Sequence, residues 1–377
     1  MLRSTGMHIV HVTCAHEWND VRIYERMALS TARAGHRVTI VAPRPSSGEP
    51  APAGGVEVVG LERPGSRIRR FTLAARAACR TASRVPADVY HLHDAELLPW
   101  AASSPRIAGR AMFDAHEDLA GSLRSRTWIP APLRPATARG AALALHSLLP
   151  RLAGTIAATP AIGQMLPARN RLGVVQNFPE VDDRGQGSVP RRRTAAYVGS
   201  LDAARGSAVL WSMAAALGER GIGLEIAGLV EEAPIVAAGC AVPVLHGTLS
   251  RPNVDDLLAR AGVGLVLFQP APNHVASQPN KLFEYMAAGL PVVASDFPLW
   301  RELVIGSGAG LVVDPTDPRA ACDAVERILG DAALARTMSE SGRAAVRQRF
   351  RWATQLEVLL RAYERVASGR GLPRAGS

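Results

Sequence analysis

The feature that most constrains the fold of this chain is a regular alternation of short β-branched runs with helix-forming segments. Residues 8–13 and 37–41 are apolar and β-branched, and a helical pattern over residues 22–34, ended by Gly35, lies between them. This order is typical of a βαβ unit, in which a covering helix connects two parallel strands. The alternation continues along the chain and predicts an α/β protein with parallel sheets covered by helices.

A polar stretch divides this alternation into two halves. Residues 179–193 are rich in arginine, glycine and aspartate, which indicates an interdomain linker, and strand-like runs resume at residue 195. A length of 377 residues is also more typical of two domains than of one. We predict one Rossmann-like domain over residues 1–182, a second over residues 183–350 and a terminal helical segment over residues 351–377.

Hydropathy and cysteine spacing limit where the chain can function. No apolar run approaches the roughly 18 to 20 residues that a membrane-spanning helix needs. The first residues lead into a strand-like run rather than a secretory signal, so we expect a cytoplasmic protein. The four cysteines have no CxxC spacing, which predicts neither disulfides nor a cysteine zinc site. We expect small buried residues at Cys14, Cys79, Cys240 and Cys322.

Two Rossmann-like halves make a nucleotide-dependent oxidoreductase the first function to test. Such enzymes have a GxGxxG loop between a strand and a helix, which places the pyrophosphate at the helix N-terminus. Here residues 306–310 read Gly-Ser-Gly-Ala-Gly but precede a strand-like run. The sequence therefore argues against dinucleotide binding.

Lys281 is the only lysine among the 43 lysine and arginine residues, which indicates a place for a compact point charge. Pro279 and Asn280 mark the start of a helix whose unpaired N–H groups attract anions. Lysine in that first turn is unfavourable unless an anion such as a diphosphate is bound. One turn later, Glu284 can accept hydrogen bonds from paired ribose hydroxyls. An ordinary amphipathic helix with exposed Lys281 and Glu284 is the alternative.

Residues 279–294, Pro-Asn-Lys-Leu-Phe-Glu-Tyr-Met-Ala-Ala-Gly-Leu-Pro-Val-Val-Ala, resemble the donor-binding motif of family-four glycosyltransferases with the GT-B fold. Further similar segments, in order, cover nearly the whole chain. They are residues 20–23, 89–94, 113–117, 197–201, 205–206 and 297–302. The subgroup that the chain resembles most consists of bacterial enzymes of surface polysaccharide and exopolysaccharide assembly.

The resemblance implies two doubly wound, Rossmann-like domains facing a cleft. The C-terminal domain would bind a UDP- or GDP-linked sugar, the N-terminal domain would bind the acceptor, and a helix near residues 351–368 would return to the N-terminal domain. It also implies no metal ion or other cofactor and retention of anomeric configuration. The acceptor would be a glycan, a lipid-linked molecule or a secondary metabolite. No carboxylate nucleophile is evident, which favours a front-face displacement.

The resemblance also assigns roles to individual residues. His116 would be the active-site histidine near the donor sugar, with Asp114 orienting its ring, and Arg205 and Lys281 would neutralise the departing diphosphate. Donor-binding residues would be Gly199, Ser200, Asn280, Leu282, Glu284, His246 and Gly247, the last two near the base. On the acceptor side, the cleft would be lined by His16, Asp20, His93 and Asp114.

Two positions depart from the family pattern. Ala276 stands where the family usually has a first glutamate, and Ser200 stands where it often has an arginine. Part of the subgroup shares both departures, so we interpret them as a subgroup trait. They keep two alternatives open, a non-catalytic GT-B partner subunit and a nucleotide-sugar epimerase of the same fold.

Histidines provide a rival hypothesis. His91 and His93 are two residues apart on a predicted strand, so their imidazoles should point to the same side, and Asp94 and His116 could add metal ligands. A metallohydrolase with an HxHxDH motif would continue with histidine, but residues 95–97 read Ala-Glu-Leu. The sequence therefore favours the transferase over metal-dependent hydrolysis.

Seven arginines cluster in the N-terminal half, among alanines and a few larger apolar residues. An amphipathic basic helix of this kind can lie on the anionic inner face of a membrane, or it can simply be solvated. Nucleic-acid binding is disfavoured, because aromatic residues are only 5% of the chain and few accompany the arginines. The cluster consists of Arg63, Arg67, Arg69, Arg70, Arg76, Arg80 and Arg84.

Overall fold

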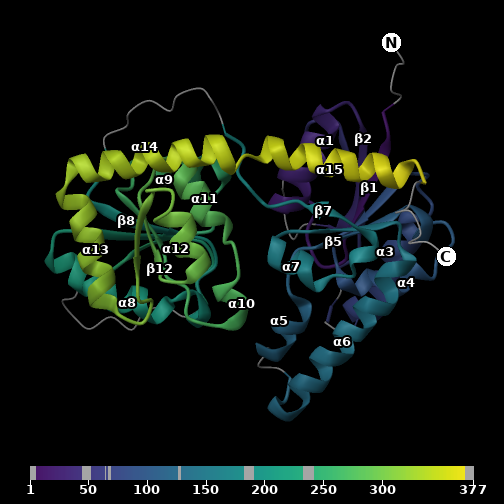
Figure 1. The fold of residues 1–377 in the computed structure, drawn as a ribbon, viewed down its shortest axis with the longest axis horizontal. Helices are drawn as coiled ribbons and strands as arrows, with labels where there is room; N and C mark the ends of the chain where they lie inside the picture. The colour runs from purple at the N-terminus through teal and green to yellow at the C-terminus, as the bar shows by residue number, and fades with distance from the viewer. Residues whose placement is uncertain are drawn as a thin grey trace. The chain divides into compact units, whose positions relative to one another are not determined.

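A computed structural model describes residues 6–44, 52–63, 65–66, 69–125, 129–181, 191–231 and 242–369. The chain divides into two compact units (Figure 1). Unit 1 comprises residues 1–177 and 352–377, and unit 2 comprises residues 178–351. Each unit has a parallel sheet with its own core, so the predicted α/β class is confirmed.

Unit 1 contains a seven-stranded parallel sheet in the order β3-β2-β1-β4-β5-β6-β7. The chain moves outward from β1 in one direction and then restarts beside it with β4, which is the doubly wound arrangement. The strands are β1 (His8–Val12), β2 (Arg37–Pro43), β3 (Val56–Leu61), β4 (Val89–Leu92), β5 (Ala111–Ala115), β6 (Gly154–Ala157) and β7 (Arg171–Val174).

Helices cover both faces of this sheet. The helix predicted over residues 22–34 begins as a π-helix, η1 (Val21–Ala28), and continues as α1 (Leu29–Arg33). Asp20 caps it, because its carboxylate accepts from the backbone N–H groups of Arg22 and Ile23. The other helices include η2 (Arg70–Ala74), α3 (Ala75–Ala82), η3 (Ala95–Leu97), α4 (Leu98–Ala102), α5 (Leu119–Ser125), α6 (Arg134–Leu148) and α7 (Pro160–Met165).

The last helix of the chain, α15 (Trp352–Ala367), packs into unit 1. Its apolar side chains join those of the sheet in one core cluster, which includes Leu359 and Ile156. Two hydrogen bonds reinforce this packing: Trp352 Nε1 donates to Ser30 Oγ at 3.1 Å, and the Tyr363 hydroxyl lies 2.8 Å from His91 Nδ1. Residues at both ends of the sequence therefore build unit 1.

Unit 2 repeats the arrangement with six parallel strands in the order β10-β9-β8-β11-β12-β13. The strands are β8 (Thr194–Val198), β9 (Gly223–Ala227), β10 (Val244–Gly247), β11 (Val263–Val266), β12 (Val292–Ser295) and β13 (Gly310–Val313). The main helices are α8 (Ser207–Glu219), α9 (Arg251–Arg260), α10 (Pro272–Val275), α11 (Asn280–Ala287), α12 (Pro298–Val304), α13 (Pro318–Gly330) and α14 (Ala332–Arg349). A short 3-10 helix, η8 (Ala203–Arg205), precedes α8.

The cysteines, the helix lengths and one glycine-rich segment bear on the predicted location and class of the protein. Cys14, Cys79 and Cys322 are buried free cysteines, as predicted, whereas Cys240 lies outside the described residues. Among the described helices, none combines the length and apolar character required to cross a bilayer. The glycine-rich segment 306–310 leads into β13, which begins at Gly310, so this segment does not open a helix.

Candidate functional site

In unit 2, the residues predicted to hold the donor lie at the carboxyl edge of the sheet. Gly199 follows β8, and Lys281 is in the first turn of α11, in the connection between β11 and β12. Strands β8 and β11 are neighbours on which the chain winds outward in opposite directions. Ligands of doubly wound sheets bind at this kind of switch point. The fold therefore brings together two residues that are 82 positions apart in the sequence.

Lys281 is enclosed by aromatic rings and by Gly199. Its Nζ lies 3.7 Å from the centre of the Tyr197 ring and 5.2 Å from that of Phe268. A Cβ at Gly199 would stand 3.1 Å from Nζ, and the φ of +119° there is also one that other residues rarely adopt. Glycine at this position thus leaves the space that the lysine side chain occupies.

The surroundings of Lys281 lower the pKa of its ammonium group. Burial, and then the charge of Arg205, lower its pKa to about 7, while Glu284 and Asp202 act in the opposite direction. The desolvated ammonium lacks a direct carboxylate partner strong enough to restore its ordinary pKa. A bound anion would supply that partner, so the site favours a negatively charged ligand.

Arg205 is positioned by the turn that precedes α8. Asp202 accepts from the backbone N–H of Arg205 at 2.8 Å and also forms an ion pair with its guanidinium. The Arg205 side chain remains 40% exposed. A second cation is thus held near Lys281 and remains accessible to a ligand.

The first turns of α11 present the other predicted donor residues. Asn280 begins the helix, Leu282 is buried beneath it, and Glu284 forms an ion pair with Arg251 at 3.1 Å. The hydroxyl of Tyr285 accepts from the backbone N–H of Val198 at 2.8 Å. This bond ties α11 to the end of β8.

Three glycines follow or end the adjacent strands β8, β9 and β10. A Cβ at Gly228 would stand 2.3 Å from the carbonyl oxygen of Gly199. The backbone N–H of Gly228 donates to the carbonyl of Gly247 at 2.7 Å. Gly228 was not among the predicted site residues, although its place directly after a strand could have indicated it. Beside it, His246 Nε2 lies 2.9 Å from Glu225 Oε2, and the Tyr197 hydroxyl donates to the carbonyl of Ser200 at 2.7 Å.

Unit 1 has a pocket of about 460 Å³, again at the switch point of its sheet. The predicted residues His16, His93, Asp114 and His116 all line it, and Asp20 lies next to His16 without lining the pocket. Their strands and loops converge because β1, β4 and β5 are neighbours in the sheet. The structure therefore gathers four of these residues in one place.

His16 faces two carboxylates. Its Nδ1 lies 3.6 Å from Asp20 Oδ2 and its Nε2 lies 3.4 Å from Asp94 Oδ1. Asp94 is itself held by the backbone N–H of Cys14 at 2.6 Å. The ring of His16 meets that of His116 edge-on, with centroids 5.5 Å apart. Two histidines thus form one wall of the pocket.

The Asp114 side chain, which was predicted to orient the ring of His116, contacts Arg22 and His93 instead, and the backbone carbonyl of Asp114 is the group that lies near His116. Arg22 Nε and Nη2 donate to the Asp114 carboxylate at 2.7 and 2.8 Å, and His93 Nδ1 lies 3.4 Å from it. His116 Nδ1 instead lies 3.3 Å from the backbone carbonyl of Asp114. Burial acts to raise the pKa of Asp114, but the charge and hydrogen bonds of Arg22 outweigh it and hold the pKa well below its ordinary value. Arg22 binds the Asp114 carboxylate through two hydrogen bonds, so Asp114 is the partner in a buried ion pair.

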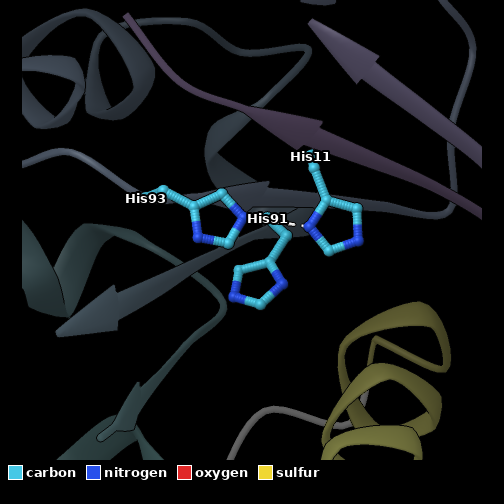
Figure 2. A group of neighbouring side chains, drawn as sticks. All are labelled: His11, His91 and His93. Atoms are coloured by element: carbon cyan, nitrogen blue, oxygen red, sulfur yellow. Dashed lines mark hydrogen bonds between the residues drawn. The ribbon is translucent and has the colours of Figure 1, made fainter. Parts of the chain in front are cut away.

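Three buried histidines, His11, His91 and His93, form a cluster of which His93 also lines the pocket (Figure 2). As predicted, His91 and His93 point to the same side of β4, and their ring centroids are 4.4 Å apart. His11 joins them from β1, where it is in register with His91, and its Nδ1 shares a hydrogen bond of 2.9 Å with His93 Nε2. Burial lowers the pKa of all three rings, so each is neutral near pH 7. Its position within a β-branched run was the only sequence signal for His11.

The cluster also tests the metallohydrolase hypothesis. One nitrogen from each ring lies within 4.8 Å of the others, a spacing from which a metal ion could be bound. Each ring uses one nitrogen in a hydrogen bond to another ring or to Tyr363, an arrangement that metal-ligating histidines also show for their second nitrogen. In the described part of the chain, His116 is not a member of this cluster. Its position is that of a pocket residue beside His16.

The basic cluster is only partly available to an external partner. Arg63 forms an ion pair with Glu17, Arg70 with Glu96 at 2.8 Å, and the Arg76 guanidinium lies 5.6 Å from the centre of the Trp100 ring. Arg67 lies outside the described residues. At least three of the seven arginines therefore contribute to packing within unit 1.

Comparisons with known proteins agree with this architecture. Residues 21–175 match the family described as glycosyl transferase 4-like domain, and residues 192–331 match the family described as glycosyl transferases group 1. A phosphatidyl-myo-inositol mannosyltransferase from Mycobacterium leprae is 37% identical over 87 residues. That match spans only 23% of this chain and 23% of the mannosyltransferase.

Solved structures resemble the chain over almost its full length. A sucrose-phosphate synthase from Thermosynechococcus elongatus has a TM-score of 0.72 at 17% identity, covering 96% of this chain and 99% of that one. Anabaena Alr3699/HepE, solved in complex with UDP and glucose, has a TM-score of 0.67 at 14% identity, covering 95% and 99%. Two doubly wound units of this kind define the GT-B class. Since the two family matches together extend over most of both units, the chain belongs to the family-four, group 1 glycosyltransferases.

Proposed function

We propose that the protein transfers a sugar from a nucleoside-diphosphate donor to a hydroxyl acceptor, with retention of configuration and without a metal ion. The observation that carries the proposal is the proximity of two basic side chains, Lys281 and Arg205, at the switch point of the sheet in unit 2. Two cations with few protein partners match the charge of a diphosphate leaving group. A metal-independent transferase needs fixed positive charge of this kind at the β-phosphate.

The neighbouring groups support a nucleotide rather than a simple phosphate. Glu284 lies about one turn along α11 from Lys281, a spacing along the helix that suits a ribose beside a diphosphate. His246 and Gly247 at the end of β10 would lie near the base. The Anabaena protein was solved with UDP, which makes UDP the first donor base to test and GDP the second.

The acceptor would bind in the pocket of unit 1, with His116 near the reacting groups. The two carboxylates deepest in this pocket are occupied, Asp114 by Arg22 and Asp94 by backbone N–H groups. Their engagement supports a front-face displacement over a covalent glycosyl-enzyme intermediate. In that reaction the acceptor oxygen bonds to the anomeric carbon on the face from which the diphosphate leaves, and its proton passes to the departing phosphate oxygen.

Contact with an anionic membrane is also part of this proposal. Leu73 is 63% exposed on the segment that carries Arg80 and Arg84, so this face could meet lipid. Because other arginines of the segment have partners within unit 1, we expect this contact to be weak by itself.

Thermal unfolding of the purified protein with UDP, GDP, TDP and ADP, with and without magnesium, tests the donor assignment. Selective stabilisation by one base, independent of magnesium, is expected, and at a hundred times the dissociation constant it amounts to about 2.7 kcal/mol. Product analysis with the matching nucleotide sugar then distinguishes transfer from epimerisation. Stabilisation by no nucleotide would contradict the proposal, and binding without turnover would indicate a non-catalytic partner.

A further inference from the structure

The pocket of unit 1 has both polar and apolar lining residues. His16, His116 and the carboxylates already described line it together with four leucines. Leu119 and Leu123 come from α5, Leu145 comes from α6, and Leu166 follows α7. The four leucines give no hydrogen bonds to sugar hydroxyls and offer apolar surface to a ligand instead.

The helices that supply the leucines are unusual on their outer surface as well. Helices α5 and α6 pack side by side, as Figure 1 shows, and α6 has Ala138 as its only buried residue among those described. Leu143 is 66% exposed on α6, and Leu133, just before the helix, is 56% exposed.

Charge around these helices is also one-sided. Between Asp118 and Glu180 the sequence contains seven arginines and neither aspartate nor glutamate. Exposed Arg124 and Arg139 accompany the exposed leucines of this part of unit 1, and exposed Glu117 precedes α5. Exposed leucines combined with positive charge are complementary to an anionic lipid phase. Helices α5 and α6, which supply leucines to the pocket, therefore also carry features that suit contact with lipid.

We infer that the acceptor is an amphiphile, a molecule whose hydroxyl-bearing head lies against His16 and His116 and whose apolar chain lies along Leu123 and Leu145. This inference rests on the proposed function only in calling the bound molecule the acceptor. It selects the lipid-linked class over a free glycan. Burying the chain supplies binding energy that a hydroxyl head alone, which exchanges water for protein partners, does not supply.

A series of alkyl β-D-glucosides with increasing chain length, kept below their micelle concentrations, tests the inference by calorimetry on the full chain. Affinity should increase about two- to fourfold for each added methylene, because each buried methylene contributes up to about 0.8 kcal/mol. Glucose and short gluco-oligosaccharides should bind much more weakly. An affinity that does not depend on chain length, or oligosaccharides that bind better than octyl glucoside, would overturn the inference.

Two variants on the same helix locate the chain. Leu145→Ser should reduce the gain per methylene to below about 1.5-fold, whereas Leu143→Ser, on the exposed face, should leave it unchanged. Leu123→Ser provides the same test from α5 if Leu145→Ser fails to fold. Equal chain-length dependence in wild type, Leu145→Ser and Leu123→Ser would place the alkyl chain elsewhere and contradict the inference.

Titration of UDP and GDP into the same preparations separates the two proposals. If nucleotide binds and chain length has no effect, the amphiphile inference fails and the donor assignment stands. If chain length matters but no nucleotide binds, the pocket assignment stands and the proposed transferase fails.

Discussion

The ammonium nitrogen of Lys281 lies 3.7 Å from the centre of the Tyr197 ring, beside the backbone of Gly199. An aromatic face stabilises a cation, but less than hydration does. Because burial removes that hydration, the net effect of the site is to lower the pKa of Lys281. The chain's only lysine is thus poised between its charged and neutral forms near pH 7.

Nucleotide affinity should fall as pH increases from 7 to 9. A diphosphate favours the charged form of Lys281, whose pKa in the free protein is about 7, so above that pH binding must be accompanied by proton uptake. We expect up to a tenfold loss of affinity per pH unit for UDP or GDP, measured by calorimetry. Lys281→Met should bind more weakly at pH 7 and lose this slope. An identical slope in that variant would assign the pH dependence to another group.

Gly199→Ala should weaken nucleotide binding about tenfold and destabilise unit 2 by about 1 to 3 kcal/mol. The added Cβ would stand 3.1 Å from Lys281 Nζ, and alanine is strained at a φ of +119°. Gly221→Ala is the matched control, because Gly221 has a φ of +66° but no atom near its Cβ position. The control should lose stability and keep its nucleotide affinity. Equal affinity losses in both variants would show that strain, and not displacement of Lys281, weakens binding.

Asp114→Asn should destabilise unit 1 by about 3 to 5 kcal/mol, because it leaves the buried Arg22 guanidinium without its charged partner. The folded-state pKa of Asp114 is depressed, so its contribution is present above the unfolded pKa of about 3.9 and is lost as pH falls. Denaturant unfolding measures the loss. Glu57→Gln removes the partner of the exposed Arg37 and should cost less than about 1 kcal/mol. Similar costs for the two variants would contradict the buried pair.

The histidine cluster should make unit 1 sensitive to mild acid. The pKa values of the three rings are lowered by burial, so the unfolded chain binds more protons than the folded chain below about pH 6.5. Stability should therefore decrease from pH 7 to pH 5, by up to about 1.4 kcal/mol per pH unit for each ring. His11→Gln should reduce that slope, whereas His146→Gln on the exposed face of α6 should not. A slope unchanged in His11→Gln would exclude His11 as a source.

Local sequence patterns were sufficient for much of the fold. Alternation of β-branched runs and helical segments predicted both parallel sheets, because strand and helix periodicities are local properties. Strand ends were less accurate: the runs at 8–13 and 37–41 correspond to β1 (His8–Val12) and β2 (Arg37–Pro43). Helix α6 was not predicted, since a mostly exposed, alanine-rich helix has no clear apolar stripe.

The candidate site, like the fold, could be predicted from the sequence only in part. The sequence alone determined the start of α11, the place of Lys281 in its first turn and the shared direction of His91 and His93, because these follow from spacing within one element. Only the tertiary structure decided that Arg22 binds the carboxylate of Asp114, 92 positions away in the sequence. It also decided that His11 on β1 lies in register with His91 on β4. It alone also decided that burial lowers the pKa of Lys281. Desolvation and long-range pairing depend on which residues the folded chain brings together, and no local pattern contains that information.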